Sequence, residues 1–120
     1  MPQRALLLVD HGSRLAEANA VLEEAAGLLK RQRPDLIVAY AHMELAEPTL
    51  AQACAQCVQA GATEVVVHPY MLSPGRHAAR DIPRLVSESA KLFPAVRFRV
   101  TPPLGLHPKI MEVVLERAGL

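Results

Sequence analysis

The sequence contains few aromatic residues and no tryptophan: Phe, Trp and Tyr together make up 3% of its 120 residues. The core must therefore consist mainly of Leu, Val, Ile and Ala, and the aromatic platforms on which single-stranded nucleic acids stack are scarce. A strong excess of one charge is also missing, since the net charge at pH 7 is +1. This balance provides no basic field for binding a duplex, and we expect no nucleic-acid partner.

The chain also lacks any apolar run of the roughly 18 residues that a membrane helix needs. No basic segment followed by a long apolar one opens it, so we expect neither a membrane anchor nor an export signal. Its two cysteines, Cys54 and Cys57, lie in a helical pattern and form no disulfide framework, which favours a reducing cytoplasm. Buried packing is the first interpretation of this pair, and a cluster bridged across a dimer is the alternative.

Short apolar runs alternate with segments of helical periodicity. The apolar runs predict strands at 5–9, 36–41, 64–69 and 96–100, and the periodic segments predict helices at 15–33, 48–60, 78–92 and 107–118. Such alternation predicts right-handed βαβ units and a four-stranded, doubly wound parallel sheet with helices on both faces. Length and composition predict a single globular domain over residues 1–120. Arg97 and Arg99 alternate along the last strand, as on a sheet edge.

The stretch from His68 to Pro83 combines two histidines, two arginines and three prolines. Proline fixes φ and removes a backbone donor, so we expect a stiff loop from the third strand to His77. The ligand crevice of a doubly wound sheet lies beyond the carboxyl ends of its strands, and this loop belongs there.

His11, Glu44 and His77 follow the first three strands at equal intervals of 33 residues. One βαβ repeat takes about 30 residues, so the spacing returns the chain to the same sheet edge each time. Two imidazoles and a carboxylate suit ferrous iron, cobalt, nickel or zinc with positions left open for a substrate. Taken singly, each residue has a simpler interpretation: a turn or cap for His11, a solvated carboxylate for Glu44, and a helix cap for His77.

Four further polar residues flank these candidates in the sequence: Ser13, Arg14, Arg76 and Arg80. Guanidinium groups beside helix N-termini form a receptor for carboxylates, so we expect these residues to bind substrate. The chain has neither a Gly-x-Gly-x-x-Gly nor a P-loop motif, and Ser13 lacks the Gly-x-Ser-x-Gly elbow. Nucleotide binding and hydrolase chemistry therefore have no motif in their favour.

Three segments resemble the sirohydrochlorin chelatase family, most closely its short, single-domain ferrochelatases. They are Asp-His-Gly-Ser-Arg at 10–14, Ala-His-Met-Glu-Leu-Ala-Glu-Pro at 41–48, and Pro-Gly-Arg-His at 74–77 with Asp-Ile-Pro at 81–83. The resemblance implies a chelatase-like (flavodoxin-like) three-layer α/β sandwich that forms a homodimer. It also implies insertion of a divalent metal, Fe²⁺ first, into sirohydrochlorin to give siroheme, with His11, Glu44 and His77 as catalytic residues and metal ligands. Sirohydrochlorin and Fe²⁺ or Co²⁺ would be the partners, and no other cofactor is implied.

Several alternatives stay open at this point. The metal could be cobalt or nickel, as in related tetrapyrrole chelatases; the protein could carry a metal or tetrapyrrole without turnover; or the chain could be half of a two-domain enzyme. Asp10, where many members have glycine, could orient His11 or cap the following helix. His42 and His68 could contact substrate or simply end their strands, and His107 is interpreted as a helix cap.

Overall fold

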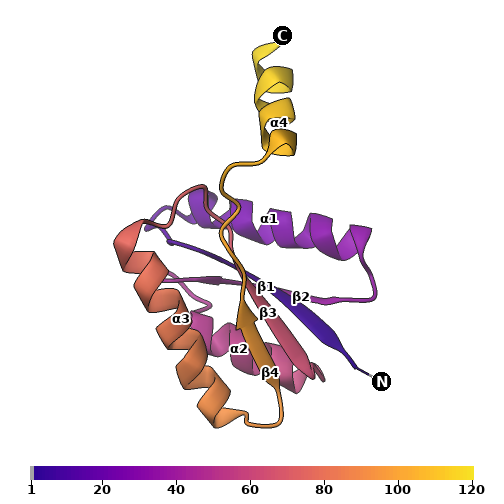
Figure 1. Ribbon diagram of the computed structural model, residues 1–120, viewed down its shortest axis with the longest axis vertical. Helices are drawn as coiled ribbons and strands as arrows, with labels where there is room; N and C mark the ends of the chain where they lie inside the picture. The colour runs from indigo at the N-terminus through magenta and orange to yellow at the C-terminus, as the bar shows by residue number, and fades with distance from the viewer. Residues whose placement is uncertain (1) are drawn as a thin grey trace.

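The computed structural model describes residues 2–120, which form four strands and four helices in strict alternation. The strands are β1 (Arg4–Asp10), β2 (Ile37–His42), β3 (Glu64–Pro69) and β4 (Arg97–Val100). The helices are α1 (Ala16–Gln32), α2 (Leu50–Gln59), α3 (Gly75–Leu92) and α4 (Pro108–Ala118). The predicted element order and the all-parallel sheet are confirmed (Figure 1).

The strand order is β2-β1-β3-β4, which matches the first four strands of a flavodoxin-like sheet. β1 pairs with β2 on one side and β3 on the other, and β4 forms an edge, as the alternating arginines predicted. The order changes direction between β1 and β3. In such sheets the ligand crevice opens at this switch point, beyond the carboxyl ends of the strands.

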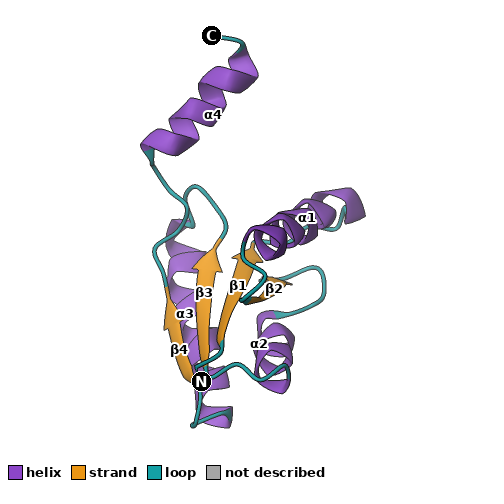
Figure 2. Ribbon diagram, turned by 90° about the vertical axis from the view of Figure 1, so that its right-hand side faces the viewer, coloured by secondary structure: helices purple, strands orange, loops and turns teal. Residues whose placement is uncertain are grey.

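The two faces of the sheet are packed differently. Alternate residues of β1 and β3 point into the main core with α2 and α3; it contains Leu7, Val9, Val65, Val67 and Ile82. The opposite side chains of β1 meet α1 in a smaller cluster around Leu8, Leu22 and Ala26. These layers form the three-layer sandwich, but α4 is not part of it. Helices lie on both faces of the sheet, as predicted, with α1 on one face and α2 and α3 on the other, while α4 leaves the sheet (Figure 2).

Two helix starts differ from the prediction by more than one residue. α2 begins at Leu50 rather than 48, because Thr49 caps it: its hydroxyl accepts from the backbone N–H of Gln52, whose side chain in turn caps Thr49. α3 begins at Gly75, three residues earlier than predicted. Proline is tolerated at a helix entrance, so Pro74 starts this helix where the sequence pattern suggested a loop.

None of the helices within residues 2–120 has the length and apolar character needed to cross a membrane.

Candidate functional site

His11 and Glu44 lie side by side at the carboxyl edge of the sheet. The backbone N–H of Met43 donates to the carbonyl of Asp10 over 2.9 Å, and that of Glu44 donates to the carbonyl of His11 over 3.2 Å. The pairing of β1 with β2 thus continues past the strands and joins the two loops. Both side chains are exposed, so they can reach a ligand in the crevice.

Gly12 is required for this approach of the two loops. Its φ is +89°, and a Cβ atom at this position would collide with the carbonyl oxygen of Glu44. A residue with a side chain would therefore be strained by its backbone angle and would also force the loops apart. The glycine of the His-Gly-Ser turn holds His11 next to Glu44.

The Asp10 side chain makes a second contact between the ends of β1 and β2. Its Oδ1 lies 2.6 Å from Nδ1 of His42, whose side chain is 1% exposed. An ionised carboxylate can only accept, so Nδ1 of His42 carries the proton. The two residues are register partners at the ends of β1 and β2. Asp10 thus contacts His42 rather than His11, and the helix-cap alternative does not hold because the α1 N-cap, Leu15, has no side-chain capping bond.

Ser13 is fixed in the turn before α1. Asn19 both accepts from the Ser13 backbone N–H (2.9 Å) and donates to the Ser13 carbonyl (2.7 Å), while the Ser13 hydroxyl oxygen accepts from the N–H of Leu15 (3.0 Å). The hydroxyl proton remains available to a ligand. Arg14, the next residue, is exposed.

His77 lies in the first turn of α3 and not in the preceding loop, which corrects the predicted boundary. Its Nε2 is 2.9 Å from Oδ2 of Asp81 one turn later, and the His77 side chain is 69% exposed. Arg80 and Arg84 also approach Asp81, at 3.4 and 3.7 Å. Asp81, with 13% side-chain exposure, is therefore an organising carboxylate at the start of α3 that the sequence analysis did not single out. The i, i+4 spacing of His77 and Asp81 could have identified this pair in the sequence, because residues four apart lie next to each other on a helix.

The predicted ligand set is only partly assembled. The loops that carry His11 and Glu44 and the first turn of α3, which carries His77, follow strands of the same sheet, and backbone hydrogen bonds join the two loops. Within residues 2–120, no three His, Cys, Asp or Glu side chains lie close enough together to hold a metal ion. The three-residue site therefore stays a prediction. Arg76 and Arg80 are exposed near His77, as a substrate clamp requires.

His68 is engaged within the sheet. Its Nδ1 lies 2.8 Å from Oγ1 of Thr101, the residue that follows β4. Burial lowers the pKa of His68, so the imidazole is neutral near pH 7.

Cys54 and Cys57 are buried on the inner side of α2, where burial raises both thiol pKa values, that of Cys57 to about 12. Such thiols are packing groups.

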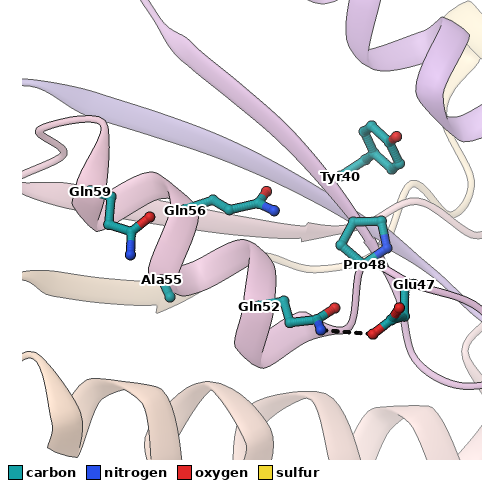
Figure 3. Close-up of a pocket in the computed structure, with 7 residues that line it drawn as sticks. All are labelled: Tyr40, Glu47, Pro48, Gln52, Ala55, Gln56 and Gln59. Atoms are coloured by element: carbon teal, nitrogen blue, oxygen red, sulfur yellow. Dashed lines mark hydrogen bonds between the residues drawn. The ribbon is translucent and has the colours of Figure 1, made fainter.

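A hollow of about 580 Å³ lies beside β2 and α2 (Figure 3). It is lined by Tyr40, Glu47, Pro48, Gln52, Ala55, Gln56 and Gln59. One of these, Gln52, donates to the Glu47 carboxylate over 2.8 Å. None of the predicted site residues lines this hollow.

The chain is similar in sequence and in structure to known proteins. The family model described as CbiX matches residues 5–119. The chain is 46% identical to a chloroplastic sirohydrochlorin ferrochelatase of Arabidopsis thaliana, over 93% of this chain and 50% of the relative. It is 31% identical to a sirohydrochlorin cobaltochelatase of Methanococcus maripaludis, over 96% of this chain and 97% of the relative.

Among solved structures, the sirohydrochlorin chelatase SirB from Bacillus subtilis subspecies spizizenii, in complex with cobalt, is similar with a TM-score of 0.81 and 31% identity. The match covers 98% of this chain and 50% of that one. The chain thus spans about half the length of the Arabidopsis and Bacillus proteins and nearly all of the Methanococcus protein.

Proposed function

The chain belongs to the CbiX family, and from this premise we propose that it is a sirohydrochlorin chelatase, a lyase-class enzyme that inserts Fe²⁺ to give siroheme. The observation that carries the proposal is the junction at the carboxyl edge, where Gly12 lets the His11 turn pack against the backbone of Glu44. An imidazole and a carboxylate on adjoining loops, both exposed at the carboxyl edge of a parallel sheet, suit a divalent ion that must be held and then released.

Metal insertion removes two pyrrole protons and strips water from the ion. In the proposed mechanism, the imidazoles of His11 and His77 hold the ion over the macrocycle and, once the ion has passed to the ring, accept the pyrrole protons. Glu44 offsets the charge of the ion or carries a proton to solvent. Asp81 accepts from Nε2 of His77 when that nitrogen is protonated, and it thereby orients the ring.

Sirohydrochlorin carries peripheral carboxylates, which need a cationic receptor. Arg14, Arg76 and Arg80 are exposed around the edge and would bind these groups as bidentate partners. The Ser13 hydroxyl, already oriented by its bond from Leu15, would donate to one of them. No redox or nucleotide cofactor takes part in this scheme.

Cobalt insertion is the second candidate. It is favoured by the Methanococcus cobaltochelatase, which this chain matches over 97% of its length, and the SirB structure contains cobalt. The ligand types do not separate Fe²⁺ from Co²⁺. The experiment that decides is anaerobic competition between the two ions, with nickel as a third arm, for limiting sirohydrochlorin.

We also propose a domain organisation, an oligomeric state and a cellular compartment for the protein. We expect a single catalytic domain that works as a homodimer, since two copies would supply the length of the Arabidopsis and Bacillus proteins. Two buried free thiols are compatible with a reducing cytoplasm.

The test is absorbance-monitored insertion with multiple turnovers. We expect His11→Ala and His77→Ala each to lower the rate about tenfold or more, because each removes a ligand and a proton acceptor. His107→Ala is the matched control: this histidine caps α4 through a 3.0 Å bond from the N–H of Lys109 and is none of the predicted ligands, so its loss should leave the rate near wild type. A non-catalytic carrier would instead stop after one equivalent, and wild-type rates in His11→Ala or His77→Ala would remove the ligand assignment.

A further inference from the structure

His42 is almost completely buried, yet one of its two ring nitrogens has no protein partner. Its side chain is 1% exposed, and its Nδ1 lies 2.6 Å from Oδ1 of Asp10. Within residues 2–120, Nε2 of the same ring takes part in no hydrogen bond. No fully buried polar side-chain atom of these residues lacks a partner, so Nε2 must touch solvent through an opening in the surface.

That opening is a hollow of about 230 Å³ between α1 and the end of β2. We name it the His42 hollow. Its wall contains His42 and four other polar residues: Asn19, Glu23, Tyr40 and Glu47. Tyr40 and Glu47 also line the hollow of about 580 Å³ beside β2 and α2 (Figure 3), so the two hollows are neighbours.

The contact with Asp10 makes Nε2 of His42 an electron-pair donor. A carboxylate accepts and cannot donate, so in the neutral ring the proton stays on Nδ1 and the lone pair is on Nε2. Metal-binding histidines in proteins have this arrangement: the other ring nitrogen donates to a carboxylate, which fixes the tautomer and orients the ring. The imidazole of His42 is thus prepared to bind a borderline divalent ion.

The wall of the His42 hollow is negatively charged. Glu23 and Glu47 contribute two carboxylates, and no Lys or Arg is among the described residues of the wall. Tyr40 donates to Oε1 of Glu23 and Gln52 donates to Oε2 of Glu47, both over 2.8 Å. Each carboxylate is therefore held by a neutral donor that leaves its charge in place. A hollow with these charges attracts cations.

The His42 hollow has room for an ion together with water. Its volume of about 230 Å³ is several times the roughly 30 Å³ that one water molecule occupies in the liquid. Within residues 2–120, no three His, Cys, Asp or Glu side chains are close enough together to enclose a metal ion. An ion bound here would therefore take one direct bond from His42 and keep several waters, which Glu23 and Glu47 would hold by hydrogen bonds. Such an ion is released readily.

We propose that the His42 hollow is a second metal site, where Nε2 of His42 binds a divalent ion of the Fe²⁺ or Co²⁺ class and Glu23 and Glu47 stabilise its hydration shell. Glu44 follows His42 by two residues, and the Met43 N–H joins this loop to Asp10, next to His11. The second site thus adjoins the predicted catalytic site and holds the metal substrate before insertion. This holding role rests on the proposed function, whereas the binding of the ion does not.

The experiment adds Co²⁺ alone, without tetrapyrrole, to the full chain under anaerobic conditions. Proton NMR then detects ring protons that paramagnetic Co²⁺ shifts far from the normal range. His11→Ala/His77→Ala removes the predicted ligands of the catalytic site. In this variant we expect one shifted signal that exchanges with water, from the Nδ1–H that Asp10 protects. Adding His42→Gln should abolish the signal, and far-ultraviolet circular dichroism checks that each variant is folded.

A second variant tests the wall and leaves His42 in place. Glu23→Gln/Glu47→Gln, on the same background, should weaken Co²⁺ binding about tenfold, because the carboxylates around the ion are lost. The matched control is Glu17→Gln/Glu24→Gln, two exposed carboxylates of α1 outside the wall, which should bind Co²⁺ as before. With the catalytic site intact, Glu23→Gln/Glu47→Gln should also slow insertion at limiting metal and recover when metal is saturating.

Three results would overturn the second site: no shifted exchangeable signal in His11→Ala/His77→Ala, the same signal after His42 is replaced, or unchanged Co²⁺ affinity in the Glu23 and Glu47 variant. Equal insertion rates at limiting metal would remove the holding role. If the signal and the affinities follow the prediction while wild type inserts no metal, the proposed function fails and the second site stands. The two failures are therefore distinguishable.

Discussion

Oδ1 of Asp10 and Nδ1 of His42 lie 2.6 Å apart at the ends of two paired strands, directly behind the residues expected to handle the metal. His42 is one of only two buried polar side chains within residues 2–120. A buried ring nitrogen that carries a proton needs an acceptor, and Asp10 supplies it. The pair therefore holds together the two loops that present His11 and Glu44.

Removing the carboxylate should destabilise the fold. Asp10→Ala leaves the buried Nδ1–H without an acceptor and should lower the free energy of unfolding by about 1–3 kcal/mol. Asp10→Asn should lower it less, because the amide oxygen can still accept. Urea unfolding at pH 7 measures both. Asp35→Ala, which breaks the exposed pair with Arg33, is the control and should change little. If Asp10→Ala is as stable as wild type, the pair is not a structural clamp.

Gly12→Ala should test the contact between the His11 and Glu44 loops, apart from the general cost of replacing a glycine that has a positive φ. The new Cβ would collide with the Glu44 carbonyl at a φ of +89°, so we expect a loss of stability of about 1–3 kcal/mol together with a large loss of insertion rate. Gly61→Ala is a matched control, since Gly61 has a φ of +102° with no atom near its Cβ position. It should lose about 1 kcal/mol and keep its activity. Equal activity losses in the two variants would argue against the His11–Glu44 junction.

Thiol reactivity should be very low in the native state. Because burial raises the pKa of Cys57 to about 12 and also raises that of Cys54, almost no thiolate exists at pH 8. A colourimetric disulfide reagent should therefore titrate two thiols in denaturant and react only slowly without it. Rapid labelling of either cysteine in the native protein would show that α2 opens or that these thiols are reactive.

His68 should contribute to acid sensitivity. Burial holds its pKa below the usual 6.5, so the unfolded state binds its proton more readily than the folded state. Stability from this group is complete above pH 6.5 and is lost as the pH falls from there through the lowered pKa. His68→Gln can still bond Thr101 but does not titrate, so its unfolding free energy should fall less than that of wild type between pH 7.5 and 5. Parallel losses in the two proteins would assign the acid sensitivity to other groups.

The sequence by itself determined the order of elements, the parallel sheet and the edge position of β4. The reason is that the periodicity of the apolar residues and the turn-forming residues between the elements determine local structure. The equal spacing of His11, Glu44 and His77 predicted that each of them follows one of the first three strands, and each does. Boundaries were predicted less well where two signals compete: Pro74 and Gly75 indicate a loop, yet they begin α3 and place His77 in a helix.

Only the tertiary structure decided which partners the polar residues take. Asp10 meets His42 and not His11, His68 meets Thr101, and Asp81 meets His77, because strand register and helix rotation select contacts between residues up to 33 positions apart. The direction of α4 was likewise decided by the hydrogen bonds of residues 101–105 to the chain after β3. Periodicity predicts that a helix has an apolar side, but it carries no information about the surface that this side covers.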